Sequence, residues 1–187
     1  MKEIVFVTTN KGKIASAQEY LNTTKLIPYN AELIEPRSDN IRKIAKEKVI
    51  QAYNIVNEPC IALDAGFFIK SLNGFPRAYV NHALDTIGVE GILKLMEDKT
   101  EQECEFRSCL VFYDGSHMEF FESKSSGTLS KSIRGKDSHK KWSDLWYVFI
   151  PKNFDKTLAE FSEDDFAKYQ TLKEDSAIKK FAQWYEK

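Results

Sequence analysis

The chain has 187 residues, of which 42% are hydrophobic and 13% aromatic, so it can build a folded core and is not a disordered polypeptide. Its formal net charge of −1 gives no reason to expect a nucleic acid or a membrane as partner. Three cysteines without a C-x-x-C pair argue against a disulfide framework and a zinc site, and no apolar run reaches the roughly 18 residues that a membrane helix needs. We therefore expect one cytoplasmic domain over residues 1–187.

The first predicted elements are a buried strand at residues 4–7 and a helix that begins after a polar turn at residues 8–13. A strand, a short turn and a helix N-terminus often bind anions, because the first helical N–H groups are unpaired, and Lys11 and Lys13 add positive charge. The turn lacks the glycines of a P-loop and of a dinucleotide-binding turn. These residues alone leave two interpretations open, an anion site and an ordinary capped turn.

A long amphipathic helix is predicted over residues 41–57, and a short apolar strand follows at residues 60–63. Asp64 comes directly after this run, and the small residues Ala65 and Gly66 allow a ligand to approach the backbone there. Carboxylates at the ends of buried strands often belong to the ligand site of an open α/β sheet, although a lone aspartate more often caps a loop. Asp64 is therefore a candidate residue of a ligand site, and its position alone does not decide between that role and a loop cap.

The rest of the chain adds further helices and strands. Helices are predicted at residues 79–86, 89–96 and 173–185, and strands at residues 26–29, 33–34, 104–113, 118–124 and 145–150. This order predicts an α/β fold with a mixed central β-sheet and flanking helices, arranged as two lobes with a cleft between them.

Several short motifs occur in an order that is typical of one enzyme family. They are T-x-N-x-x-K at Thr8, Asn10 and Lys13, a helix lysine at Lys48, a strand end at residues 63–66, a segment with glycine and proline at residues 71–77, a G-x-E-G helix at residues 88–96, Ser126-Gly127, Arg134-Gly135, and F-I-P at residues 149–151. On these residues the chain resembles the inosine triphosphate pyrophosphatases, which remove deaminated purine nucleotides. The resemblance extends over nearly the whole sequence.

The resemblance implies a homodimeric nucleoside triphosphate pyrophosphatase that acts on deaminated or other non-standard purine nucleotides, with the nucleotide in a cleft between two lobes. It implies Mg²⁺ as cofactor, since phosphoryl transfer depends on positioning and on neutralising phosphate charge. Asp64 would be the catalytic base and a metal ligand. The substrate-binding residues would be Thr8, Asn10, Lys13, Lys48, Ala65, Lys168 and Lys173.

The chain departs from the family pattern at the metal site. Leu63 stands where the family has the first acid of a pair, and Lys43 stands where it has a helix acid that helps to hold metal. The Lys43 ammonium could replace part of the metal's charge, and Glu35, Asp39 or Glu47 could supply a displaced ligand. We therefore expect a pyrophosphatase with a weakened metal site. The alternatives are a family member that binds a nucleotide without cleaving it and a purely structural dimer unit.

Overall fold

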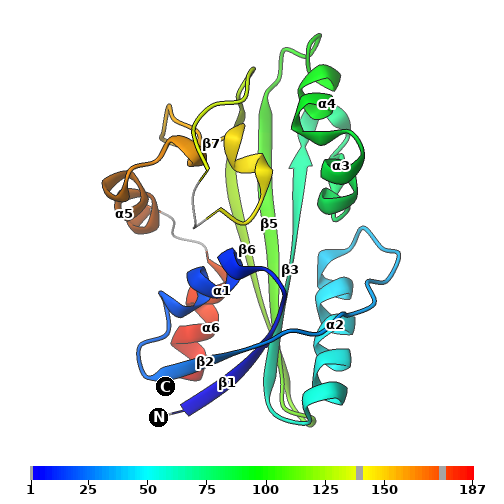
Figure 1. Ribbon diagram of the computed structural model, residues 1–187, viewed down its shortest axis with the longest axis vertical. Coiled ribbons are helices and arrows are strands. Elements are labelled where there is room, and N and C mark those ends of the chain that lie inside the picture. The colour runs from blue at the N-terminus through cyan, green and yellow to red at the C-terminus, as the bar shows by residue number, and fades with distance from the viewer. Residues whose placement is uncertain (1, 138–140, 173–175) are drawn as a thin grey trace. The chain divides into compact units, whose positions relative to one another are not determined.

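The computed structural model describes residues 2–137, 141–172 and 176–187 (Figure 1). The α-helices are α1 (Lys11–Gln18), α2 (Ile41–Val56), α3 (Val80–Thr86), α4 (Gly88–Leu95), α5 (Glu163–Leu172) and α6 (Ala177–Tyr185). The strands are β1 (Lys2–Val7), β2 (Thr24–Tyr29), β3 (Cys60–Ile69), β4 (Pro76–Arg77), β5 (Glu103–Tyr113), β6 (Met118–Leu129) and β7 (Phe149–Pro151). The 3-10 helices are η1 (Lys70–Leu72), η2 (Asp144–Tyr147) and η3 (Leu158–Glu160). Within these described ranges, no helix combines the length and the apolar character that crossing a membrane requires.

The strands pair in the order β2-β1-β3-β5-β6-β7, with β4 paired to β3. β1 is parallel to β2 and to β3, whereas β4 is antiparallel to β3 and β7 is antiparallel to β6. The predicted α/β fold with a mixed central sheet and flanking helices is therefore confirmed. The residues fall into two compact units, the first formed by Met1–Ala65, Ser108–Ser123 and Ser176–Lys187 and the second by Gly66–Arg107 and Lys124–Asp175. A single domain with a nucleotide cleft between two lobes stays a prediction.

Helices cover both faces of the strands in the first unit (Figure 1). Alternate residues of a strand point to opposite faces, and Ile4 and Phe6 of β1 point to the same one. There they join a buried cluster with Ala17 of α1 and Phe181 of α6. On the other face the strands meet α2, where the Cys60 thiol lies 3.8 Å from a backbone carbonyl oxygen of that helix. The hydrophobic alternation of the sequence thus builds two apolar layers.

Helix α2 begins where the sequence predicts and ends within one residue of the predicted end. The side chain of Asn40 caps its N-terminus by accepting a hydrogen bond from the N–H of Lys43 at 3.1 Å. Asn57 ends the helix in the left-handed conformation, with φ 53°. The buried stripe consists of Ile41, Ile44, Ala45, Val49 and Ala52. Lys48 lies beside this stripe and is therefore half-buried.

The strand predicted at residues 60–63 is longer than expected. β3 continues through Asp64 and Gly66 without interruption, so Asp64 lies inside a strand and not after its end. The small, polar composition predicts a turn, but Phe67 and Ile69 are fully buried and keep the chain extended. As a result the Asp64 residue is only 6% exposed.

The second unit has an aromatic core of its own. The ring of Phe106 lies 4.7 Å from that of Phe67 and 4.9 Å from that of Phe149, measured between centroids. The sequence predicts a strand over residues 145–150, but its first half is the 3-10 helix η2 and only its end is β7. The reason is local, because the Ser143 hydroxyl accepts a hydrogen bond from the N–H of Leu145 at 3.3 Å and starts a turn.

Other boundaries also differ from the prediction. Residues 33–34 form no strand, because the side chain of Gln51 takes the backbone hydrogen bonds there. β6 continues past its predicted end at residue 124, and α5 forms where no helix was predicted. The last predicted helix is present as α6 from residue 177, and residues 173–175 of that prediction lie outside the described residues.

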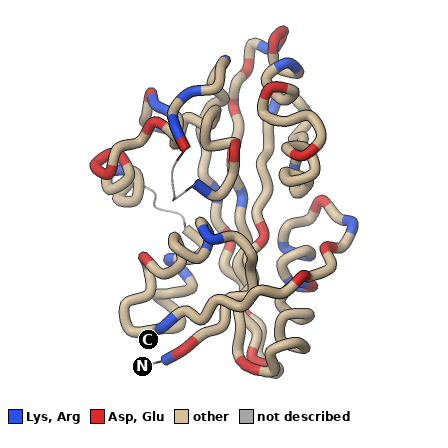
Figure 2. The backbone as a smooth tube through the Cα atoms, in the orientation of Figure 1, with Lys and Arg blue, Asp and Glu red and all other residues tan. Residues whose placement is uncertain are grey.

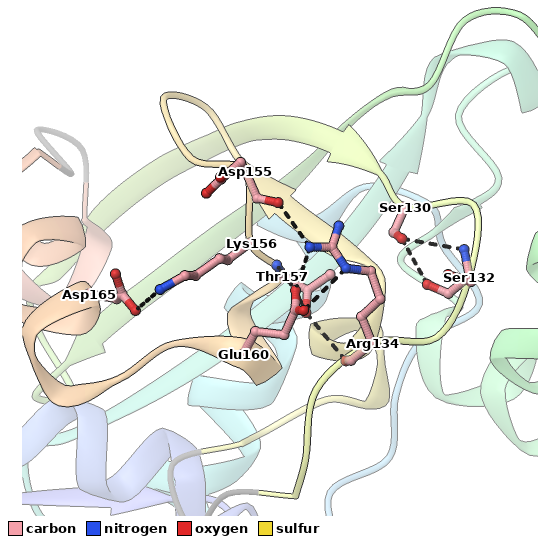
Figure 3. Close-up of polar contacts among 8 residues, drawn as sticks. All are labelled: Ser130, Ser132, Arg134, Asp155, Lys156, Thr157, Glu160 and Asp165. Atoms are coloured by element: carbon pink, nitrogen blue, oxygen red, sulfur yellow. Dashed lines mark hydrogen bonds and ion pairs between the residues drawn. The ribbon is translucent and has the colours of Figure 1, made fainter.

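Arg134 and Gly135, one of the sequence motifs, have a structural explanation in the second unit. Figure 3 shows the Arg134 guanidinium against the Glu160 carboxylate, with Nε–Oε1 at 3.2 Å and Nη2–Oε2 at 2.9 Å. The same Nη2 donates to the carbonyl oxygen of Asp155 at 3.0 Å. Glu160 also accepts a hydrogen bond from the N–H of Thr157 at 2.8 Å and so caps η3. The ion pair of Arg134 and Glu160 therefore joins two loops and a helix.

Gly135 lies beside this network with φ 92°, a conformation that residues with a side chain rarely adopt. A Cβ atom at this position would lie 2.4 Å from the backbone carbonyl carbon of Ala159. The N–H of Lys136 donates to the carbonyl oxygen of Ala159 at 3.1 Å, which holds the two segments at this separation. The close approach of two backbones therefore requires glycine.

Gly135→Ala should lower the free energy of unfolding by about 2–4 kcal/mol, because it adds backbone strain and a steric clash with Ala159. The matched control is Gly74→Ala, which has a similar φ of 86° but whose added Cβ would have side-chain atoms as its nearest neighbours, Arg77 at 3.3 Å and Phe68 at 3.6 Å. Urea denaturation compares the two variants. Equal losses would show that the contact with Ala159 does not matter.

Candidate functional site

Charged side chains of the first unit meet around Asp64. Lys48 donates a hydrogen bond to Asp64 Oδ1 at 3.3 Å and a shorter one to Glu35 Oε1 at 2.8 Å. Lys13 Nζ lies 3.5 Å from the carbonyl oxygen of Leu63, the residue before Asp64. The side chains of Lys48 and Asp64 are 14% and 9% exposed, so this ion pair is largely removed from water. The fold thus brings together the aspartate and both phosphate-binding lysines that the sequence predicts.

The turn between β1 and α1 positions Lys13. The Thr8 hydroxyl accepts a hydrogen bond from the N–H of Asn10 at 3.2 Å. Asn10 is the N-cap of α1, and its side-chain oxygen accepts a hydrogen bond from the N–H of Lys13 at 3.0 Å. The first turn of the helix carries no acidic residue, so its positive end is not neutralised from within. Thr8 and Asn10 shape the turn, and their contact with a substrate stays a prediction.

A tethered loop brings Glu35 to Lys48. The Gln51 side chain accepts a hydrogen bond from the N–H of Ile34 at 2.9 Å and donates one to the carbonyl oxygen of Ile34 at 2.8 Å. Gln51 follows Lys48 by three residues, so both side chains lie on one face of α2. The sequence indicates Glu35 only as one of three substitute ligands and gives no sign of the tether. The spacing of Lys48 and Gln51 is the one signal that could have revealed it.

Burial and mutual charge determine the proton affinities of these groups. Burial raises the pKa of Asp64 above its usual value, although Lys48 and Lys13 oppose the shift. Burial, reinforced by the charge of Lys48, lowers the pKa of Lys13 to about 8. Burial disfavours the charge of Lys48 as well, but Asp64 and Glu35 outweigh it and raise the pKa of Lys48. Lys48 is therefore firmly charged at neutral pH, whereas Lys13 can lose its proton under mildly alkaline conditions.

The second carboxylate oxygen of Asp64, Oδ2, is buried and has no hydrogen-bond partner among the described residues. Such an oxygen costs free energy that a proton, a water molecule or a bound cation can recover. Figure 2 shows basic and acidic residues interspersed in both units. Asp64 is therefore the residue of this cluster most in need of a further partner.

In the part of the chain that the structure describes, no three His, Cys, Asp or Glu side chains lie close enough together to hold a metal ion. Leu63 belongs to the hydrophobic cluster between the sheet and the helices α1 and α6. Lys43 is exposed on α2, and the ammonium group beside Asp64 is that of Lys48. The hypothesis of a cation that replaces metal charge therefore fits Lys48 better than Lys43.

The remaining predicted residues are less closely tied to this cluster. Ala65 is half-buried and packs against the hydrophobic cluster of the first unit. Lys168 is exposed on α5 of the second unit, with Nζ 5.7 Å from the centroid of the Phe154 ring. Lys173 lies outside the described residues. A substrate-binding role for these three residues stays a prediction.

The fold and the cluster define an α/β protein with a buried carboxylate held beside two lysines. The chain belongs to the Ham1 family, whose family model matches residues 4–184. It is 32% identical over 89% of its length to a dITP/XTP pyrophosphatase of Hyperthermus butylicus, covering 86% of that protein. It is 28% identical over 97% of its length to a dITP/XTP pyrophosphatase of Thermococcus kodakarensis, covering 96% of that protein.

Solved structures show the same fold. A HAM1 protein from Coxiella burnetii superposes with a TM-score of 0.82 at 19% identity, over 100% of this chain and 99% of that one. The Ham1 protein of Staphylococcus aureus superposes with a TM-score of 0.79 at 21% identity, over 99% of this chain and 98% of that one. The overall architecture of the chain is therefore that of the Ham1 proteins.

Lys48→Met should lower the free energy of unfolding by about 2–4 kcal/mol at pH 8, because it leaves the Asp64 carboxylate buried without its hydrogen-bonded cation. An acid whose pKa is raised on folding, as burial raises that of Asp64, favours the folded state at low pH and loses that contribution as the pH rises. The loss of unfolding free energy caused by Lys48→Met should therefore be smaller at pH 5 than at pH 8. Urea denaturation at both pH values measures it.

A double-mutant cycle with Asp64→Asn tests whether the loss comes from this pair. We expect a coupling of at least about 1 kcal/mol, because the neutral amide no longer needs the lysine. Additive effects of the two substitutions would contradict the assignment of the Lys48 effect to Asp64.

Proposed function

We propose that the chain is a nucleoside triphosphate pyrophosphatase, which converts a nucleoside triphosphate to the monophosphate and pyrophosphate. The observation that carries this proposal is the buried Asp64 carboxylate with Lys48 and Lys13 beside it. Phosphoryl transfer depends on positioning and charge neutralisation, and lysines are common phosphate ligands. The relatives named dITP/XTP pyrophosphatases support this reaction and favour deaminated purine nucleotides as substrates. A cytoplasmic homodimer is part of the same proposal.

In this reaction water attacks the α-phosphorus, and the bond from that phosphorus to the oxygen of the leaving pyrophosphate breaks. Asp64 orients the water and accepts its proton, and the raised pKa of Asp64 makes it a stronger base than an exposed aspartate. Lys13 and Lys48 bind phosphate oxygens and offset the charge that grows on the leaving group. The backbone N–H groups at the start of α1, where Lys13 lies, add to this positive potential.

One Mg²⁺ ion that arrives with the triphosphate fits these residues. Mg²⁺ in proteins usually takes one or two carboxylates and completes its six ligands with phosphate oxygens and water. The buried Oδ2 of Asp64 is one suitable oxygen, since it has no partner among the described residues. When bound, Mg²⁺ would neutralise phosphate charge. Because Leu63 is apolar and Lys43 is exposed, we propose that this metal site is weaker than the family pattern implies.

A second candidate is a nucleotide-binding protein that does not cleave its ligand. The observation in its favour is that no three metal-ligating side chains cluster anywhere in residues 2–137, 141–172 and 176–187. Binding alone would still use Lys13 and Lys48, so the two candidates differ only in turnover. A rise in melting temperature with nucleotide, without product release, would favour the binding protein.

The proposed activity predicts that dITP, ITP and XTP release pyrophosphate faster than ATP or GTP, and that removal of Mg²⁺ slows the reaction.

Asp64→Asn should lower kcat by about 10²–10⁴-fold, because it removes the base without changing the size of the side chain. Asp98→Asn, on an exposed residue of the second unit, is the control and should change kcat less than twofold. Full activity of Asp64→Asn in a coupled pyrophosphate assay would refute the assigned base.

The lowered pKa of Lys13, about 8, predicts an alkaline limit on activity. A lysine binds phosphate in its protonated form, so kcat/KM should fall as the pH rises through about 8. Lys13→Arg keeps the charge at all accessible pH values and should move this limit upward by more than one pH unit. Lys11→Arg, on the exposed neighbour, is the control. An unchanged alkaline limit in Lys13→Arg would show that another group sets it.

A further inference from the structure

The Glu186 carboxylate binds the turn that follows α1. One of its oxygens, Oε1, accepts hydrogen bonds from the N–H groups of Asn22, Thr23 and Thr24 at 2.9, 2.8 and 2.9 Å. Burial alone would raise the pKa of Glu186, but the hydrogen bonds from Thr23 and Thr24 outweigh it and lower the pKa. The carboxylate is therefore charged at neutral pH, and hydrogen bonds to a charged acceptor are stronger than neutral ones.

Glu186 is fixed to α6, and α6 is held by other contacts. The N–H of Glu186 donates to the carbonyl oxygen of Ala182 at 3.0 Å and so continues the helix. Tyr185 contacts β1 twice, because its carbonyl oxygen accepts a hydrogen bond from the Lys2 ammonium at 2.8 Å and its hydroxyl donates to the carbonyl oxygen of Glu3 at 3.2 Å. α6 is therefore a firm support for the turn that Glu186 binds.

Helix α1 needs such a support. It is eight residues long, its buried residues are Gly12 and Ala17, and so short a helix is not stable in water by itself. The Gln18 side chain adds two longer contacts at its end, at 3.3 Å to the N–H of Leu26 and at 3.5 Å to the carbonyl oxygen of Leu21. The position of α1 therefore depends strongly on how the turn after it is held.

This dependence reaches the candidate site, because α1 carries Lys13. Lys13 lies in the first turn of the helix, and its Nζ is 3.5 Å from the carbonyl oxygen of Leu63, at the long limit of a hydrogen bond. A small movement of α1 is therefore enough to take this ammonium group away from β3.

We propose that Glu186 is a positioning residue of the candidate site. Its carboxylate holds the turn after α1 against α6 and thereby keeps the Lys13 ammonium beside β3. Glu186 acts through the backbone of residues 22–24 and α1. The inference rests on the proposed function only for the expectation that Lys13 binds phosphate, since the position of Lys13 can be followed without a ligand.

The first measurement follows the side-chain NMR signals of isotope-labelled lysines in the full chain, with the Lys13 signal assigned by its absence in Lys13→Arg. Glu186→Ala should move the Lys13 signal toward that of an exposed lysine and leave the Lys48 signal in place. Glu186→Gln should move it less, because an amide oxygen still accepts hydrogen bonds. Glu58→Ala is the control for the lost charge, because Glu58 is an exposed residue of the same unit.

The second measurement is the affinity of the same variants for inorganic pyrophosphate, by isothermal titration calorimetry with EDTA at constant ionic strength. Glu186→Ala should bind about three- to tenfold more weakly, as expected for the loss of charge-assisted contacts that hold Lys13. Loss of a negative charge by itself would strengthen the binding of an anion. In the Lys13→Met background Glu186→Ala should have no further effect, whereas in the Lys48→Met background it should weaken binding by the same factor.

An unmoved Lys13 signal in Glu186→Ala would overturn the proposal, and so would equal movement of the Lys13 and Lys48 signals, which indicates general loosening of the unit. Wild-type affinity of Glu186→Ala for pyrophosphate would refute the positioning role and leave the proposed function standing. If the Lys13 signal moves as expected but the wild-type chain does not bind pyrophosphate, the phosphate-binding role of Lys13 in the proposed function is refuted, and the positioning role of Glu186 stands.

Discussion

The buried carboxylate of Asp64 is the constraint on which the rest of the site depends. A charged side chain inside a strand costs several kcal/mol unless hydrogen bonds and a counter-charge offset the lost hydration. Lys48 supplies one such contact, and the charge of Lys13 lies nearby. Both lysines come from helices next to the strand, α2 and α1, so the packing of the first unit places the cations that the carboxylate needs. The site and the stability of this unit therefore share the same residues.

This arrangement is not fully satisfied without a ligand. Lys13 is held in surroundings that lower its pKa to about 8, and one oxygen of Asp64 is buried without a partner among the described residues. A phosphate beside Lys13 would stabilise its charged form, and a cation beside Asp64 would complete its contacts. Binding sites commonly retain such unfavourable features, because the ligand recovers the free energy that the empty fold loses. The same groups that weaken the fold would thus strengthen binding.

Hydrophobic periodicity predicts much of the fold, and long-range contacts account for what it misses. The period of α2 and its Asn40 cap are local signals, and the structure follows them. Asp64 and Gly66 read as a turn, yet burial of Phe67 keeps them within β3. The contact between Glu35 and Lys48 joins residues 13 positions apart through a loop that has no regular structure of its own. The hydrogen bonds from Gln51 to Ile34 hold this loop against α2, and a single sequence does not reveal that pairing.

Some motif residues have a role in the fold itself, and so does Leu63, where the chain departs from the family pattern. Asn10 caps a helix, and Gly135 permits a close backbone approach, so the fold itself has a use for both residues. Leu63 precedes Asp64 on β3, and successive residues of a strand point to opposite faces. Leu63 accordingly joins the apolar cluster of the first unit, where a carboxylate would lack a polar partner. The apolar residue at position 63 is therefore part of the packing of this chain, and the acid next to it, Asp64, lies on the other face of β3 beside Lys48.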